Sequence, residues 1–121
     1  MTLVDTSVWI DFFRGRRAAD RLQDLLDSGE VVMHPWVIGE LALGVLGPRR
    51  DAILRDLWLL PASVVLSHTE ILELVEAKGL AGSGIGWVDC HLLGAALVEQ
   101  IGFWTSDRRL ARVAARLELP R

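Results

Sequence analysis

Short apolar runs alternate along the chain with longer segments in which apolar residues recur every three or four positions. The apolar runs cover residues 3–4, 31–33, 64–66 and 101–105, and none of them contains a charged residue. Such runs predict strands that are buried on both faces of a sheet. Because helical segments separate the runs, the pattern predicts an α/β fold with a parallel sheet and right-handed crossovers.

The longer segments carry the signals that begin and end helices. Residues 5–7 are suited to helix capping, Pro35 suits a first turn, and Ser67 with Glu70 forms a capping box. Four glycines within residues 79–86 predict a loop. We expect helices over residues 8–13, 18–28, 35–46, 51–59, 67–78 and 88–99, and a last helix that Asp107 opens.

The composition limits the class of protein. The chain has 121 residues, 51% of them hydrophobic and 24% charged, which excludes intrinsic disorder and predicts one domain over residues 1–121. Its longest uncharged run, residues 57–69, contains Pro61 and is too short to cross a membrane. The N-terminus lacks the basic region of a signal peptide. A single cysteine, Cys90, excludes an intrachain disulfide and favours a reducing cytoplasm.

Charge is distributed unevenly along the chain. The net charge of −3 does not indicate nucleic-acid binding, yet arginines gather at residues 14–17 and again at residues 108–121. Such clusters can follow a phosphate backbone even on an acidic protein. Charge alone nevertheless favours the simpler interpretation, a solvated helix surface.

Four carboxylates have mostly apolar neighbours. Asp5 ends the first apolar run and Asp107 follows the last one. Glu40 and Asp89 lie in predicted helices, and no basic residue stands three or four positions away from either. A carboxylate buried without compensation costs several kcal/mol. Each acid also has a simpler interpretation: Asp5 and Asp107 as N-caps, Asp89 as a first-turn acid, and Glu40 as a surface residue.

Convergence of these acids would determine their chemistry. The carboxyl ends of parallel strands share one edge of a sheet, and two charges about 5 Å apart repel by roughly 3 kcal/mol at an effective dielectric near 20. Divalent cations would neutralise the cluster, and oxygen ligands alone select Mg²⁺ or Mn²⁺. Zinc is not indicated, because Cys90 has no thiol partner and the three histidines are far apart in the sequence. We expect these histidines to be structural or surface residues: His34, His68 and His91. A carboxylate-held Mg²⁺ favours hydrolysis of a phosphodiester.

Residues 3–11, Leu-Val-Asp-Thr-Ser-Val-Trp-Ile-Asp, resemble the opening of PIN-domain ribonucleases, specifically the VapC-type toxins of bacterial toxin–antitoxin pairs. Glu40, residues 84–89 and residues 104–110 match later motifs of that family in the expected order. The resemblance covers essentially the whole chain. It implies a three-layer PIN-like fold, with a short parallel sheet of four to five strands, helices on both faces and an acidic pocket at the carboxyl edge.

The resemblance also implies a function. It implies a Mg²⁺-dependent (Mn²⁺ as the alternative) cytoplasmic endoribonuclease that forms homodimers, acts on RNA and is neutralised when a VapB-type antitoxin plugs its pocket. The residues implied for catalysis and metal binding are Asp5, Glu40, Asp89 and Asp107, with Asp5 and Asp89 as the best ligands. The polar residues implied to orient carboxylates or waters are Thr6, Ser7 and Thr105. The arginines that become plausible RNA contacts are Arg14, Arg16, Arg17, Arg108, Arg109 and Arg112.

Other protein classes fit less well. A haloacid-dehalogenase-like phosphatase needs a second Asp where Ser7 stands. A response-regulator receiver needs an Asp where Ser67 stands and a Lys near its fifth strand, but Lys78 is the only lysine. The remaining alternative is a metal-binding PIN-like interaction module without turnover. Replacing Asp5 or Asp89 with Asn separates this module from a nuclease.

Overall fold

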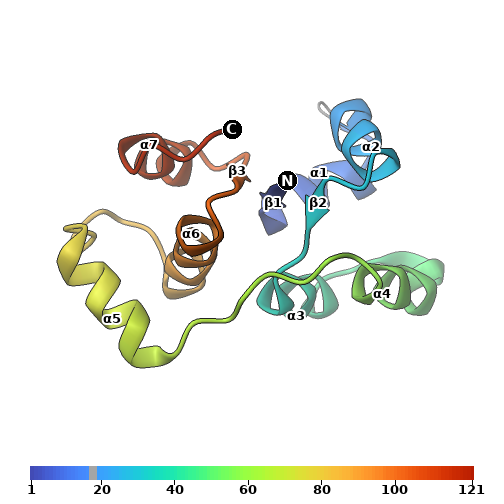
Figure 1. Cartoon of the computed structure of the whole chain (residues 1–121). Helices are drawn as coiled ribbons and strands as arrows, with labels where there is room; N and C mark the ends of the chain where they lie inside the picture. Colours follow the sequence, from blue (N-terminus) through green and yellow to red (C-terminus); the bar gives the residue numbers. More distant parts are fainter. Residues whose placement is uncertain (17–18) are drawn as a thin grey trace.

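The computed structural model describes residues 1–16 and 19–121, and a parallel sheet lies at its centre (Figure 1). In the described residues the sheet has three strands, β1 (Thr2–Val4), β2 (Val31–Val32) and β3 (Gly102–Trp104), in the order β2-β1-β3. β1 pairs in parallel with both neighbours, so that Leu3 stands opposite Val32 and Phe103. The α/β class and the parallel sheet are therefore confirmed.

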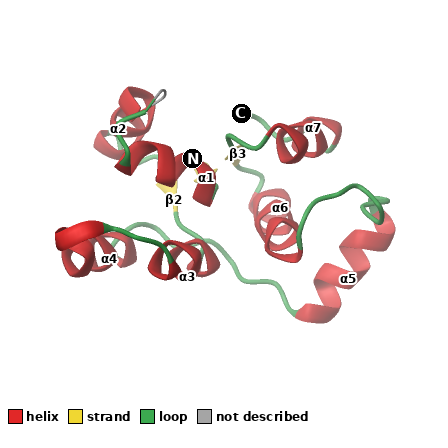
Figure 2. Cartoon of the chain, turned by 180° about the vertical axis from the view of Figure 1, so that it is seen from behind, coloured by secondary structure: helices red, strands yellow, loops and turns green. Residues whose placement is uncertain are grey.

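The expectation of four to five strands is wrong for the described residues, because residues 64–66 form no strand. Figure 2 shows this stretch as part of a long loop between two helices. One isolated parallel bridge joins Met33 to Ala62. The pairing does not extend, because the next donors of the ladder on either side would be Pro61 and Pro35, and neither has an N–H.

The described residues form seven α-helices, which flank the sheet on opposite sides (Figures 1 and 2). They are α1 (Thr6–Phe13), α2 (Ala19–Asp27), α3 (Pro35–Leu43), α4 (Arg50–Trp58), α5 (His68–Ala77), α6 (Trp87–Glu99) and α7 (Arg108–Arg116), with a 3₁₀ turn η1 (Gly47–Arg49) before α4. The predicted capping box of Ser67 and Glu70 is present at the start of α5.

Helix α3 ends three residues before the expected position. Gly44 leaves the helical conformation, with ψ at −174°. The side chain of Arg50 donates to the carbonyls of Ala42 at 2.5 Å and Gly44 at 3.3 Å. These bonds satisfy carbonyl groups that the end of the helix leaves without intrahelical partners. Arg50, six residues beyond Gly44, therefore stabilises the early end.

The hydrophobic core surrounds β1. Leu3 and Val4 are fully buried, and α6 contacts both β1 and β3. Helix α7 buries Leu110, Val113 and Ala114 and leaves its arginines exposed, as its apolar stripe predicts. Some large apolar side chains remain on the surface: Ile10, Leu43, Val45, Trp58, Leu59, Val64, Val65, Leu72 and Val98. No helix in the described residues is long and apolar enough to cross a membrane.

Candidate functional site

The carboxyl ends of β1 and β3 lie side by side and carry the centre of the candidate site. The N–H of Asp5 donates to the carbonyl of Trp104 at 2.9 Å, so the two chain segments stay in register where the strands end. Asp5 is buried, with 5% of its surface exposed. It occupies the N-cap position of α1, but its side chain makes no capping bond. The interpretation of Asp5 as a plain N-cap is therefore wrong.

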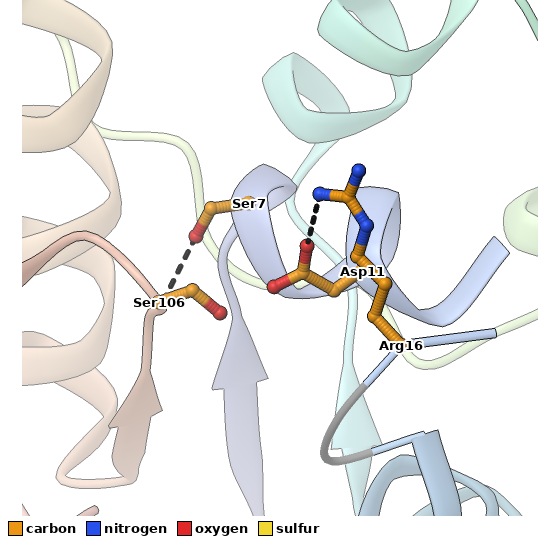
Figure 3. A network of polar contacts seen from close by, with 4 residues as sticks. All are labelled: Ser7, Asp11, Arg16 and Ser106. Atoms are coloured by element: carbon orange, nitrogen blue, oxygen red, sulfur yellow. Dashed lines mark hydrogen bonds and ion pairs between the residues drawn. The ribbon is translucent and has the colours of Figure 1, made fainter. Parts of the chain in front are cut away.

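Hydroxyl groups hold the carboxylate of Asp5 instead. Ser7 Oγ and Thr105 Oγ1 both donate to Asp5 Oδ2 at 2.7 Å. The N–H of Ser106 donates to Ser7 Oγ at 2.9 Å, a bond that links the start of α1 to the segment after β3 (Figure 3). The N–H of Asp107 donates to Thr105 Oγ1 at 3.0 Å. The structure thus places Ser7 and Thr105 beside Asp5, where the sequence predicts residues that orient carboxylates.

Glu40 approaches the same region from α3. It is exposed, and its Oε1 accepts a hydrogen bond from Thr6 Oγ1 at 2.6 Å. Helices α1 and α3 pack together, which brings these two residues within reach although 34 positions separate them. Glu40 is therefore a surface residue, as its simpler interpretation holds, but one that a hydroxyl directs toward the start of α1.

Asp89 joins the site from the first turn of α6. Its Oδ2 accepts the N–H of Gly86 at 2.9 Å, as a first-turn acid does. Partial burial raises the pKa of Asp89, and the charges of three other carboxylates raise it further, while the Gly86 bond lowers it. Those three carboxylates belong to Asp5, Asp107 and Glu40. Four acids from four separate segments therefore share one electrostatic environment.

Asp107 also keeps its simpler role. It is the N-cap of α7, and its Oδ1 accepts the N–H groups of Arg109 at 2.8 Å and Leu110 at 3.1 Å. The capping interpretation is confirmed for this residue. The carboxylate is nevertheless near enough to Asp89 to raise the pKa of that group. Capping and membership of the acidic site are therefore compatible in Asp107.

The donor set fits a hard divalent cation better than any other metal. Its acids offer only carboxylate oxygens, the ligands that Mg²⁺ and Mn²⁺ prefer. Within the described residues, no three Asp, Glu, His or Cys side chains already stand in a metal-binding arrangement. Each of the four carboxylates is instead bonded to a donor of the protein itself. Like charges repel one another, so a bound cation that neutralised these carboxylates would let them approach.

The three histidines are not scattered in space. His34 and His91 are buried, and their rings form one aromatic cluster with Trp36 and Trp87, which His68 extends. His34 Nδ1 accepts the N–H of Trp36 at 3.0 Å and so caps α3. The structural role expected of the histidines holds. The positions of the histidines in the sequence do not predict this cluster, because it forms only where α3, α5 and α6 pack together.

The predicted RNA-contacting arginines lie in different environments. Arg14, Arg108 and Arg112 are exposed. Arg16 forms a surface ion pair with Asp11 at 3.7 Å (Figure 3). Arg17 lies outside the described residues.

Two arginines, Arg21 and the predicted RNA contact Arg109, have contacts that sequence patterns did not reveal. Arg109 is exposed but lies against the loop before α6, where its Nη1 donates to the carbonyl of Gly84 at 3.4 Å. Arg21 of α2 stacks over the ring of Trp104, with its guanidinium carbon 4.0 Å from the ring centre. Both contacts join segments that are far apart in the chain, so local patterns could not have indicated them.

Comparison with known proteins adds independent evidence. The family model of the PIN domain matches residues 2–116, a range that includes all four acids of the site. Ribonuclease VapC32 of Mycobacterium tuberculosis is 47% identical over 116 residues, in strain CDC 1551 / Oshkosh and in strain ATCC 25618 / H37Rv. Each alignment covers 95% of this chain and 91% of the relative.

Proposed function

The chain belongs to the PIN-domain family, and from that premise we propose that it is a VapC-type ribonuclease toxin that cleaves RNA internally. The cleavage site is the acidic cluster of Asp5, Glu40, Asp89 and Asp107. The observation that carries the proposal is the buried carboxylate of Asp5 at the carboxyl edge of the sheet, held there by Ser7 and Thr105. Burial raises the pKa of Asp89, and the charges of Asp5, Asp107 and Glu40 are near enough to raise it further. Ligands of parallel α/β folds bind at this edge.

A divalent cation, Mg²⁺ or alternatively Mn²⁺, is the cofactor that the site fits. Asp5 and Asp89 hold the cation, and Glu40 and Asp107 complete the site directly or through water. When bound, such a cation supplies a water activated near neutral pH and neutralises charge on the phosphate. When bound, the same cation would also offset the repulsion among the carboxylates.

The remaining polar residues prepare the carboxylates for this role. Ser7 and Thr105 donate to the same oxygen of Asp5, so they direct Oδ2 into the hydroxyl network and set the orientation of the carboxylate. Thr6 does the same for Glu40. These bonds reduce the conformational freedom that binding would otherwise remove, and orientation of ligands in this way strengthens metal binding.

Arginines on the surface account for contact with RNA. We assign the phosphate backbone to the exposed side chains of Arg14, Arg108 and Arg112, together with Arg16 and Arg17. Guanidinium groups bind phosphate in two-point contacts. The ion pair of Arg16 with Asp11 is a weak surface contact that phosphate can displace.

Protein partners fit the apolar surface. A cavity of about 380 Å³ opens between α1, α2 and α4, and mostly apolar side chains such as Phe12, Phe13 and Ile53 line it. We assign this cavity to one segment of a VapB-type antitoxin that wraps the chain and plugs the acidic pocket, and the exposed apolar side chains elsewhere to a second copy of the chain. We also propose that the protein acts in the cytoplasm, a location that its single cysteine and an RNA substrate support.

The test compares antitoxin-free wild type with Asp5→Asn and Asp89→Asn. Total RNA is incubated with each protein plus Mg²⁺ or EDTA, and the cleaved ends are mapped. We expect cleavage by the wild type with Mg²⁺ alone, and none by either variant. Asp24→Asn, an exposed acid on α2, is the control that keeps full activity. Growth arrest that persists in the Asn variants without cleavage would instead establish the non-catalytic interaction module.

A further inference from the structure

The guanidinium of Arg109 packs directly on the backbone of the loop that leads into α6. Its Nη1 donates to the carbonyl of Gly84 at 3.4 Å. Gly84 has a φ of +83°, and a Cβ at this position would lie 2.6 Å from Arg109 Nη1 and 2.8 Å from its Cδ. Any other residue would be strained at this φ, and its Cβ would displace the end of the arginine side chain.

Arg109 is linked to two of the four acids by short paths. Its own N–H donates to Asp107 Oδ1 at 2.8 Å. Two residues beyond Gly84, the N–H of Gly86 donates to Asp89 Oδ2 at 2.9 Å. The contact between Arg109 and Gly84 therefore joins the segment that orients Asp89 to the helix start that Asp107 caps.

The same contact argues against two other roles for Arg109, as a charge that pairs with a carboxylate and as a contact for RNA. Among the described residues, Arg109 forms no ion pair with a carboxylate, although it follows Asp107 by two positions. Its guanidinium instead bonds to a neutral carbonyl and packs on the loop. Arg112, one turn along α7, is exposed and makes no comparable contact in the described residues. The geometry of Arg109 is that of a side chain that holds a loop.

We propose that Arg109 is a positioning residue: by packing on Gly84 it holds the loop before α6 and so sets where Asp89 stands relative to Asp107. The consequence for RNA cleavage rests on the proposed function above. The contact itself, and its effect on cation binding, does not depend on which substrate the protein cleaves.

A change in cation affinity can show whether Arg109 acts by positioning Asp89 or by its positive charge, because the two roles predict changes in opposite directions. Removal of a positive charge near carboxylates strengthens cation binding if charge alone matters. Removal of a residue that orients a ligand weakens it, and losses of about 10-fold are typical for groups that support metal ligands. Gly84→Ala keeps the charge of Arg109 but displaces its side chain. Under the proposal, Arg109→Ala and Gly84→Ala therefore change Mn²⁺ affinity in the same direction.

The experiment measures Mn²⁺ binding by thermal-shift titration, and exchange of the Gly86 amide by NMR, in the full chain. We expect Arg109→Ala, Arg109→Lys and Gly84→Ala to bind Mn²⁺ roughly 3- to 10-fold more weakly and to exchange the Gly86 amide faster. Arg116→Ala, a charge-matched change two turns along α7, should alter neither. Tighter Mn²⁺ binding by Arg109→Ala, or wild-type behaviour of Arg109→Lys and Gly84→Ala, would overturn the proposal.

A double variant guards against a general effect on folding. The three atoms nearest to a Cβ on Gly84 all belong to Arg109. In the Arg109→Ala background, Gly84→Ala should therefore weaken Mn²⁺ binding by less than it does in the wild type. Fully additive effects would contradict the proposed contact. The melting temperature of Arg109→Ala in EDTA should stay near that of the wild type, because the side chain is exposed.

Cleavage assays then distinguish this proposal from the proposed function. With Arg109→Ala, the cleavage rate should recover as Mn²⁺ is raised, while KM for RNA stays unchanged. A KM for RNA that rises at every Mn²⁺ concentration would assign Arg109 to RNA contact instead. If the wild type cleaves no RNA while Mn²⁺ binding and Gly86 exchange respond as expected, the nuclease assignment fails and the positioning role stands.

Discussion

Acidification from pH 7 to pH 5 should destabilise the protein through its buried imidazoles, because burial lowers the pKa of His91 and, to a larger extent, that of His34. His34 is fully buried, and its Nε2 has no hydrogen-bond partner in the described residues. Burial, and secondarily the neighbouring His91, lowers the pKa of His34 from 6.5 to about 4. The folded protein therefore holds this side chain neutral, with Nδ1 accepting the N–H of Trp36, over a range in which the unfolded chain binds a proton.

The sign and size of the effect follow from that difference. Because the folded pKa is the lower one, the unfolded state gains the proton first as the pH falls, so acid favours unfolding. The stabilisation that comes from keeping His34 neutral is present above pH 6.5 and is lost as the pH falls toward 4. Between pH 7 and pH 5 the loss is about 2 kcal/mol, and the complete loss is about 3 kcal/mol. This is a large share of the ~5–15 kcal/mol that stabilises a typical domain.

The assay is urea denaturation at pH 7 and pH 5, in EDTA, of the wild type and His34→Asn. Asn keeps an acceptor for the N–H of Trp36 but does not titrate. The variant is less stable at pH 7 because it leaves a cavity, and about 2 kcal/mol of that deficit should disappear at pH 5. His68→Asn, which removes an exposed imidazole, should keep most of the wild-type dependence. The same pH dependence in the wild type and His34→Asn would refute the reasoning.

Three further predictions concern charge, packing and capping. In EDTA, Asp89→Asn should melt at a higher temperature than the wild type, because burial and the neighbouring carboxylates raise the pKa of Asp89 and disfavour its charge. Mn²⁺ should raise the melting temperature of the wild type only, and a lower value for the variant in EDTA would contradict this. Gly94→Ala should lower the free energy of unfolding by about 1–2 kcal/mol, since its Cβ would lie 2.9 Å from Leu66 Cδ1 and 3.0 Å from Ile71 Cδ1. A more stable variant in urea would show that the side chains of Leu66 and Ile71 can move aside, so that the higher helix propensity of alanine prevails. Ser67→Ala should cost about 1 kcal/mol in the same assay, because α5 loses its capping box, and no change would mean that water replaces the cap.

The helices were predictable because the signals that begin and end them are local. The capping box at Ser67 and the proline that opens α3 act within one turn, so the sequence alone indicates them. The end of α3 was predicted too late, because Arg50 stabilises it from outside the helix. Residues 64–66 were predicted as a strand on composition alone. Their failure to pair depends on where the bridge at Met33 falls, because the next donors of the ladder on either side would be Pro35 and Pro61, which have no N–H.

The sequence by itself determined which residue types form the site: acids placed after apolar strands or within apolar helices, next to small hydroxyl residues. Only the tertiary structure decided which donor holds each acid. Thr105 reaches Asp5 across 100 positions and Thr6 reaches Glu40 across 34, because parallel strands end at one edge and α1 packs on α3. A hydrogen bond acts over about 3 Å. The sequence therefore predicts such a bond only when its two residues lie within one turn of each other along the chain. For residues farther apart in the sequence, only the packing of the elements brings the partners together.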